Sequence, residues 1–551
     1  MRGRGKFEKA DAMTDLSTRR SFLVTGAAAA ATVALSRTAS PSSVDSDLII
    51  RGGTVFDGTG AEGRELDVEI AGDRIIAVAP SIKSRAKEEI DARGLAVAPG
   101  FVDIHSHGDG NMQADPRVES VIRQGVTTMV VGADGSSRAT GAAGNSFADL
   151  FKSIDTLRPG PNVASMVGFG TIREAVIGDM DRMATPDEIK RMTAMVDSAL
   201  NDGACGGSSG LEYTPGAFAS RDELIALSRP LAGHRLPYAT HMRNEDDRLL
   251  EAIEESIAVA RGAGCPLQIS HLKTQGPRNW AKLAQVFLLI DAAREARTDV
   301  AFDRYPYVAY ATGLTNLFPV WSRDGSIDQF LARVSDPATA ARIRQETLSK
   351  VELIGGWDNV QISGVRTPED RDAEGKRLGA YAKSLGRDPY ETTVALLTRN
   401  KGDVGMLGHA MSEDNLEKIL AHPLGMVCSD GGGFAVDGPT RRGSPHPRGA
   451  GTFPRVLGRY VRERKSLTLA QAIRKMTSQP ASRVRLRDRG MIARGMAADV
   501  VVFDPSTVAD TATFNAPFSY PVGIGVVVVN GVVALRDGQR SPVMSGRALR
   551  A

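Results

Sequence analysis

Phe101-Val102-Asp103-Ile104-His105-Ser106-His107 joins an apolar run to two histidines that stand two positions apart. In an extended strand, residues i and i+2 project from the same face, so both imidazoles can reach one bound ion. Two histidines at this spacing also occur by chance, and the pattern alone is therefore weak. Its place at the end of an apolar strand strengthens it, because catalytic groups of parallel α/β folds gather where strands end.

Five more apolar runs of strand length follow, with polar side chains at or after their carboxyl ends. They are Thr127–Val131, Tyr238–His241, Pro266–His271, Val300–Asp303 and Met426–Asp430. Helix-capping pairs stand in other parts of the chain: Thr185 with Glu188, Ser220 with Glu223, and Thr468 with Gln471. Alternation of strands and helices predicts an α/β fold whose parallel sheet closes as a TIM-like (β/α)8 barrel. A doubly wound open sheet is the alternative, although no GxGxxG motif follows a strand.

Both ends of the chain have a β pattern instead. Short apolar runs separated by Gly52-Gly53 and Gly72-Asp73 precede the barrel, and Asn530-Gly531 is a hairpin signal after it. This predicts a small β-sandwich domain built from both termini. The predicted division is an export signal and linker at 1–45, the first part of the β domain at 46–98, the barrel at 99–485 with an insertion at about 313–388, the second part of the β domain at 486–540, and a tail at 541–551.

The composition limits the classes of partner. Lys and Arg number 68 against 65 Asp and Glu, and the formal net charge of +3 is too balanced for a nucleic-acid binder or a membrane-surface protein. We therefore expect a small-molecule substrate, no nucleic acid and no stable membrane anchor, and the oligomeric state stays open. The three cysteines, Cys205, Cys265 and Cys428, are isolated, which argues against a disulfide framework or a structural zinc site.

The N-terminal segment has the features of a targeting signal. Arg19-Arg20 precedes the apolar run Leu23–Leu35, which is shorter than the roughly 20 residues that a transmembrane helix needs. This pattern predicts export through the twin-arginine pathway, and thus a periplasmic or otherwise exported protein. A frayed basic N-terminus is the alternative. Either Met1 or Met13 can be the start, and Met13 gives the signal a more usual length.

Four of the eight histidines stand at or after strand ends and form a candidate metal set. His241 and His271 end two runs that are about one βα repeat apart, which would place them beside the pair formed by His105 and His107. Asp430 ends a further run, and its carboxylate can bind a metal ion and accept a proton from metal-activated water. Histidines satisfied within the core, and a helix-capping or turn aspartate, are the structural alternatives.

The chain resembles the D-aminoacylase (N-acyl-D-amino-acid deacylase) family of the amidohydrolase superfamily over about residues 47 to 540. The motifs that carry the resemblance are Ala98–His107, Gly125–Thr128, Thr240–Glu245, Ser270–Lys273, Ala421–Pro423 running into Ser429–Gly431, Pro445–Arg448 and Gly451–Leu457. The resemblance implies a TIM-like barrel with a small β domain. It also implies hydrolysis of linear amides with one or two zinc ions or other divalent metals.

The resemblance assigns roles to individual residues as well. The implied metal ligands are His105 and His107 at one position and His241 and His271 at a second one, with Asp430 as metal ligand and catalytic base. The implied substrate-binding residues are Arg448 and Lys273 for a substrate carboxylate, with Tyr305 as a hydroxyl donor. Asp134 stands where the family has a cysteine ligand. A carboxylate is a harder ligand than a thiolate, but it binds zinc and can bridge two ions. A turn aspartate is the alternative for this position.

The leading functional hypothesis is metal-dependent hydrolysis of the amide bond of N-acyl-D-amino acids or related carboxylated amides. One alternative is a cyclic amide hydrolase of the dihydroorotase or hydantoinase type, but no lysine stands where those enzymes carry a carboxylated one. The other alternative is a non-catalytic ligand-binding barrel. The presence of Asp134 in place of the family's cysteine is evidence for it, whereas the four candidate histidines together with Asp430 are evidence against it. The acyl group, the side chain accepted, D or L stereochemistry and the metal stay open.

Overall fold

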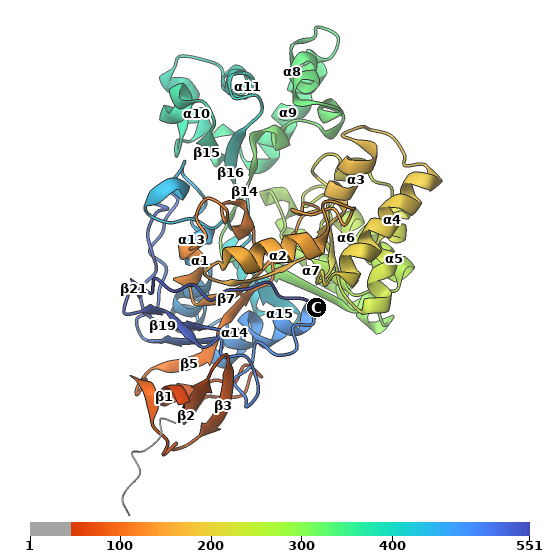
Figure 1. The fold of residues 1–551 in the computed structure, drawn as a ribbon. Coiled ribbons are helices and arrows are strands. Elements are labelled where there is room, and N and C mark those ends of the chain that lie inside the picture. Colours follow the sequence, from red (N-terminus) through yellow and green to blue (C-terminus); the bar gives the residue numbers. More distant parts are fainter. Residues whose placement is uncertain (1–45) are drawn as a thin grey trace, which may run out of the picture. The chain divides into compact units, whose positions relative to one another are not determined.

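The computed structural model describes residues 46–551 as a mixed α/β protein (Figure 1). The fold class predicted from the sequence is confirmed at this level. The predicted export signal at 1–45 lies outside the described residues, so it stays a prediction. None of the helices in the described range combines the length and apolar character needed to cross a membrane.

Two parallel sheets contain the strands that the apolar runs predict. The larger has the order β17-β13-β12-β11-β10-β9 and the smaller the order β6-β7-β8. Their bounds are β6 Phe101–Asp103, β7 Val126–Val131, β8 Asn162–Ser165, β9 Val167–Gly168, β10 Gly207–Gly210, β11 Tyr238–His241, β12 Leu267–Ile269, β13 Val300–Arg304 and β17 Gly425–Val427. Every residue in these strands is buried. Strands covered on both faces favour apolar side chains, which explains the continuous apolar runs found in most of these strands.

The edges of the two parallel sheets lie next to each other at two places. Only Met166 separates β8 from β9 along the chain. Beyond the carboxyl ends of β6 and β17, the Asp430 N–H donates to the His105 carbonyl oxygen at 2.8 Å, and the His107 N–H donates to the Gly431 carbonyl oxygen at 3.0 Å. Backbone hydrogen bonds thus hold the segment with the two histidines against the segment with Asp430.

Helices lie between the parallel strands. They include α1 Glu119–Ile122, α2 Phe147–Leu157, α3 Phe169–Ile177, α4 Pro186–Asn201, α5 Arg221–His234, α6 Leu249–Ala263, α7 Leu283–Glu295 and α12 Glu413–Ala421, followed after β17 by α13 Arg448–Arg455, α14 Leu469–Met476 and α15 Ser478–Arg483. The capping boxes predicted at Thr185 and Thr468 form at the starts of α4 and α14. The Ser220 side chain accepts the N–H of Glu223, as expected for the start of α5.

A nine-stranded sheet combines strands from both ends of the described chain (Figure 1). It contains β1 Ser46–Val55, β2 Arg64–Ala71, β3 Arg74–Ala79, β4 Ala86–Asp91, β5 Ala96–Pro99, β18 Val500–Phe503, β19 Ile524–Val529, β20 Val532–Arg536 and β21 Gln539–Arg540. Gly52 and Gly53 form a bulge within β1, since the pairing with β2 shifts register between Ile50 and Gly53. Asn530 and Gly531 both have positive φ, 48° and 80°, as the predicted tight hairpin turn requires.

The segment after β13 forms a fourth, antiparallel sheet with its own helices. Its strands are β14 Ala309–Gly313, β16 Val404–His409 and β15 Val360–Val365, with β16 in the middle. Its helices are α8 Ile327–Ser335, α9 Ala340–Ile354, α10 Leu378–Ser384 and α11 Pro389–Arg399. Figure 1 shows these elements as the green and cyan part of the chain.

A buried ion pair joins the nine-stranded sheet to the smaller parallel sheet. The Asp499 carboxylate pairs with the Arg489 guanidinium. It also accepts the Asn530 N–H at 2.7 Å and the Asn162 side-chain amide at 3.1 Å. Asn162 begins β8 and Asp499 directly precedes β18, so this one carboxylate fixes the two sheets against each other.

We predict that Asp499→Ala lowers the free energy of unfolding by about 3–5 kcal/mol, because it leaves the Arg489 guanidinium buried without its partner. Glu88→Ala is the matched control, since Glu88 pairs with Arg536 on the exposed face of the same sheet. It should cost no more than about 1 kcal/mol. Urea unfolding followed by circular dichroism measures both values, and equal losses in the two variants would contradict the role given to Asp499.

Candidate metal centre

Polar residues that follow three of the parallel strands adopt a strained backbone conformation. Asp134, His271 and Asp430 have φ values of 52°, 35° and 49°, in the left-handed region that non-glycine residues rarely occupy. They follow β7, β12 and β17 by two or three residues. Such conformations persist only where the surrounding structure imposes them, and they cluster at functional sites.

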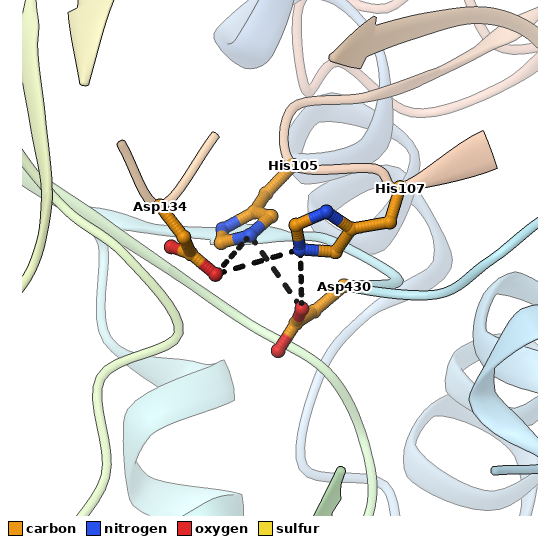
Figure 2. A group of neighbouring side chains, drawn as sticks. All are labelled: His105, His107, Asp134 and Asp430. Carbon is orange, nitrogen blue, oxygen red and sulfur yellow. Dashed lines mark ion pairs between the residues drawn. The ribbon is translucent and has the colours of Figure 1, made fainter. Parts of the chain in front are cut away.

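The first group of candidate ligands consists of His105, His107, Asp134 and Asp430 (Figure 2). The Nε2 atom of His105 lies 3.3 Å from Asp134 Oδ2 and 3.5 Å from Asp430 Oδ1. The Nε2 atom of His107 lies 3.4 Å and 3.2 Å from the same two oxygens. Two ligands at about 2.0–2.1 Å from a tetrahedral zinc ion are roughly 3.3 Å apart. The spacing of these four atoms therefore suits one ion between them.

The second group consists of Asp134, His241 and His271. His271 Nε2 lies 3.5 Å from Asp134 Oδ1, and His241 Nδ1 lies 3.9 Å from Asp134 Oδ2. The two ring nitrogens, His241 Nδ1 and His271 Nε2, are 2.9 Å apart. Asp134 belongs to both groups, so its carboxylate is placed to bridge two ions. The structure thus brings together all six residues that the sequence proposes as metal ligands.

Several polar atoms of these groups are buried without a hydrogen-bond partner among the described residues. They are both ring nitrogens of His105, Oδ1 of Asp134 and Nε2 of His241. Leaving a buried polar atom unsatisfied costs about 1–3 kcal/mol. An ion between the groups would satisfy His105 Nε2 and Asp134 Oδ1, and imidazole nitrogens with carboxylate oxygens are suitable ligands for zinc. The residues present therefore fit a divalent cation.

The electrostatics of the centre also favour a cation. Burial by itself lowers the pKa of His105, but the carboxylates of Asp134 and Asp430 outweigh it and raise this pKa well above its ordinary value. The same balance raises the pKa of His107 to about 9. Burial raises the pKa of Asp430, yet the Arg448 guanidinium and the imidazoles hold it far below the ordinary range. Burial likewise raises the pKa of Asp134, but the charges of His105 and His271 hold it well below its ordinary value. Both carboxylates therefore carry their negative charge, which attracts a cation.

A second layer of side chains orients the strand ends. Asp303 accepts the His271 N–H at 2.8 Å, and its Oδ1 atom lies 3.5 Å from His105 Nδ1. Asp103 accepts the Ser429 N–H at 2.8 Å and so holds the residue before Asp430. Outer partners of this kind fix the orientation of metal-binding side chains.

Lys273 is placed differently from its predicted role. Its ammonium donates to both oxygens of Glu245 at 2.6 and 2.7 Å and lies 2.7 Å from His271 Nδ1. Lys273 does line the cavity beside the centre. Its ammonium is nevertheless already paired with Glu245, whose carboxylate also lies 3.1 Å from His271 Nδ1. Its role in holding a substrate carboxylate stays a prediction.

Arg448 and Tyr305 form the other predicted substrate-binding pair. The Arg448 Nη1 atom lies 2.8 Å from Asp430 Oδ2, and the guanidinium lies 4.6 Å from the centre of the Tyr305 ring. Arg448 Nε and the Tyr305 hydroxyl are buried without a hydrogen-bond partner among the described residues. His446 positions the arginine: its Nδ1 accepts the Arg448 N–H and its Nε2 donates to the Ala309 carbonyl oxygen, each at 3.0 Å.

A cavity of about 420 Å³ opens onto the centre. Of the predicted site residues, it is lined by His107, Asp134, His241, His271, Lys273, Tyr305, Asp430 and Arg448. Sequence reasoning assigned no role to Glu212 or Glu245, which line it as well. Glu212 Oε2 lies 3.6 Å from His241 Nε2, and although burial raises the pKa of Glu212, the charges of Lys350 and His241 lower it to about 2. Glu245 lies four residues beyond the end of β11 at His241, and a carboxylate so close to a strand end is a signal that predicts its place in the cavity lining.

Comparison with known proteins agrees with this arrangement. The model of the amidohydrolase family matches residues 88–318 and 433–535. The D-aminoacylase of Alcaligenes xylosoxydans xylosoxydans is 36% identical over 523 residues, which cover 91% of this chain and 97% of that protein. The N-acyl-D-glutamate deacylase of the same organism is 37% identical over 520 residues, which cover 92% of this chain and 96% of that protein.

One solved structure is similar over nearly its whole length. It is the N-acyl-D-glutamate deacylase of Bordetella bronchiseptica, complexed with zinc and a phosphonate inhibitor that mimics the tetrahedral intermediate of the reaction. It matches with a TM-score of 0.78 and 35% identity, over 92% of this chain and 99% of that one. The chain described here belongs to the amidohydrolase family and, within it, to the D-aminoacylase group.

Proposed function

We propose that this protein is a metal-dependent hydrolase that cleaves the amide bond of N-acyl-D-amino acids or closely related carboxylated amides. The observation that carries the proposal is the meeting of four imidazoles and two carboxylates at the ends of parallel strands, in two groups that share Asp134. The relatives named D-aminoacylase and N-acyl-D-glutamate deacylase support the substrate class. Zinc, as one or two ions, is the cofactor we propose, and the zinc in the related structure supports it.

Asp430 is the residue placed to move the proton. A bound divalent ion lowers the pKa of a water molecule and polarises the amide carbonyl. Asp430 Oδ1 faces the Nε2 atoms of His105 and His107, where such an ion would be held, and its other oxygen is fixed by Arg448. The carboxylate can therefore take a proton from the attacking water and deliver it to the leaving nitrogen.

Arg448 and Tyr305 are placed to hold the carboxylate of the substrate. Within the described part of the chain, Arg448 Nε and the Tyr305 hydroxyl are buried donors without a hydrogen-bond partner, and both residues line the cavity. A planar guanidinium matches a carboxylate in charge and shape. A carboxylate bound there lies beside Asp430, which brings the neighbouring amide bond close to the proposed base. The cavity volume of about 420 Å³ is within the range of small-ligand sites.

The fold that we propose to carry this chemistry is one closed TIM-like barrel. With β8 and β9 taken as one interrupted strand, the two parallel sheets supply the eight strands of such a barrel. The backbone hydrogen bonds between residues 105–107 and 430–431 support closure at the other edge. On this proposal the barrel is residues 99–485, and the nine-stranded sheet belongs to the small β domain of residues 46–98 and 486–540. The sandwich form that the sequence predicts for this domain stays a prediction.

The proposed function predicts that the zinc-loaded protein hydrolyses N-acetyl-D-methionine and leaves its L enantiomer essentially intact. The rate of release of free amino acid from each enantiomer, at equal substrate concentration, measures this. Hydrolysis of dihydropyrimidines without cleavage of either acyl amino acid would contradict the proposal in favour of a cyclic amide hydrolase.

Asp134→Ala should weaken zinc binding by more than about 10–100-fold, the loss that outer partners of a metal ligand already cause. The physical reason is that this carboxylate belongs to both candidate groups. Zinc content after dialysis against buffers of fixed free zinc concentration measures the change, with Glu88→Ala as the control that should bind zinc as the wild type does. Unchanged zinc affinity in Asp134→Ala would show that its carboxylate is only part of a turn.

Asp430→Asn should keep the fold and lower kcat by about 10²–10⁴-fold, the usual contribution of general acid–base catalysis. The amide has nearly the shape of the carboxylate but cannot accept a proton from water. Circular dichroism and zinc content establish that the variant is folded and loaded before kcat is measured with N-acetyl-D-methionine. Turnover close to that of the wild type in the loaded variant would exclude Asp430 as the base.

A further inference from the structure

The cavity beside the metal centre is lined by more acidic than basic side chains. Among the residues that line it, only Lys273 and Arg448 are lysine or arginine. Lys273 pairs with Glu245, and Arg448 lies against Asp430. Outside these pairs and the candidate ligands, the lining contains two further carboxylates, Glu174 and Glu212, and no further lysine or arginine.

Glu212 is the more deeply placed of the two carboxylates. It lies two residues beyond β10, and its side chain is 11% exposed. Its Oε2 atom accepts the Asn316 side-chain amide at 3.2 Å. Among the described residues, no lysine or arginine forms an ion pair with it, since the nearby Lys350 pairs with Asp246 at 2.6 Å. His241 Nε2 lies 3.6 Å from the same oxygen, and the charges of Lys350 and His241 keep this carboxylate ionised. It therefore presents a negative charge at the cavity that can attract a cationic group of a ligand.

Glu174 supplies the second carboxylate from the neighbouring strand end. It lies on α3, which directly follows β9, and β9 pairs with β10. Its side chain is exposed at the cavity and makes no hydrogen bond or ion pair among the described residues. Glu174 on α3 and Glu212 after β10 therefore line the same cavity. We refer to these two residues as the acidic wall.

We propose that the acidic wall selects substrates with a positively charged side chain, such as N-acyl-D-lysine, N-acyl-D-ornithine and N-acyl-D-arginine. This inference rests on the proposed function and makes it more specific. With the α-carboxylate held by Arg448 and Tyr305, the side chain is the part of the substrate that is free to reach the wall. A second carboxylate, as in N-acyl-D-glutamate, would meet like charge there. Rejection of unwanted partners by like charge is a common source of specificity.

The first test compares three substrates on the zinc-loaded full chain: N-acetyl-D-lysine, N-acetyl-D-methionine and N-acetyl-D-glutamate. We expect kcat/KM for the lysine derivative to exceed that for the glutamate derivative by at least about 100-fold, with methionine between them. A glutamate derivative hydrolysed as well as the lysine derivative would overturn the inference and leave the proposed function standing. No turnover of any N-acyl-D-amino acid would overturn both.

The second test uses Glu212→Gln and Glu174→Gln, with Glu88→Gln as the control far from the cavity. Each wall variant should lower the ratio of kcat/KM for N-acetyl-D-lysine to kcat/KM for N-acetyl-D-methionine. We expect a decrease of about tenfold for Glu212→Gln and a smaller one for Glu174→Gln, because solvent screens the charge of the exposed Glu174. The change should appear mainly as a higher KM for N-acetyl-D-lysine. Because Glu212 is close to His241, we expect Glu212→Gln to lower the rate with every substrate. This general decrease cancels in the ratio of the kcat/KM values of the two substrates.

The control should leave this ratio unchanged. If Glu212→Gln does not fold, the ratio of kcat/KM values in Glu174→Gln tests the inference instead. Glu174 is exposed and forms no hydrogen bond or ion pair among the described residues, so we expect this variant to fold. A ratio equal to that of the wild type in a folded wall variant would overturn the inference.

Discussion

Two buried carboxylates, Asp134 and Asp430, lie within 3.5 Å of the Nε2 atoms of His105 and His107, and the site depends on positive charge to hold them there. Removing an ionised carboxylate from water costs several kcal/mol unless an opposite charge compensates it. Asp430 has the Arg448 guanidinium on one side. Asp134 has only imidazoles as ion-pair partners among the described residues, which makes it the residue whose burial most requires a cation.

The rest of the structure serves to hold that arrangement in place. Fully buried parallel strands deliver the ligands to one edge, and strained residues after β7, β12 and β17 end those strands at the site. Asp303 and Asp103 then fix neighbouring segments by backbone hydrogen bonds, while the pair of Lys273 and Glu245 supports His271. A site whose ligands stand on rigid elements keeps its geometry.

The sequence predicts the ligands well because their signals are local. Two histidines spaced for one face of a strand, and single polar residues at the ends of apolar runs, must meet if the strands are parallel. Strand β10 was not predicted, because Gly207-Ser208-Ser209-Gly210 has no apolar run. It is a strand because β9 and β11 pair with it on both sides, and its glycines allow close approach: a Cβ at Gly210 would lie 2.1 Å from the Asp134 carbonyl oxygen.

The residues that depend on β10, or on pairs of distant segments, were therefore missed as well. Glu212 follows that strand, and its place in the cavity could not be inferred without it. The contact of Lys273 with Glu245 and that of His446 with the Ala309 carbonyl oxygen join positions that are 28 and 137 residues apart, and no local sequence pattern indicates such contacts. The family resemblance named the lysine but not the partner that occupies its ammonium.

Anomalous diffraction at the zinc absorption edge, from crystals of the zinc-loaded protein, shows whether Asp134 lies between two cation positions. We expect zinc within about 2.0–2.2 Å of Asp134, on the side of His105, His107 and Asp430, of His241 and His271, or of both. Anomalous peaks away from these side chains, or zinc bound to the histidines with Asp134 turned out of contact, would contradict this expectation.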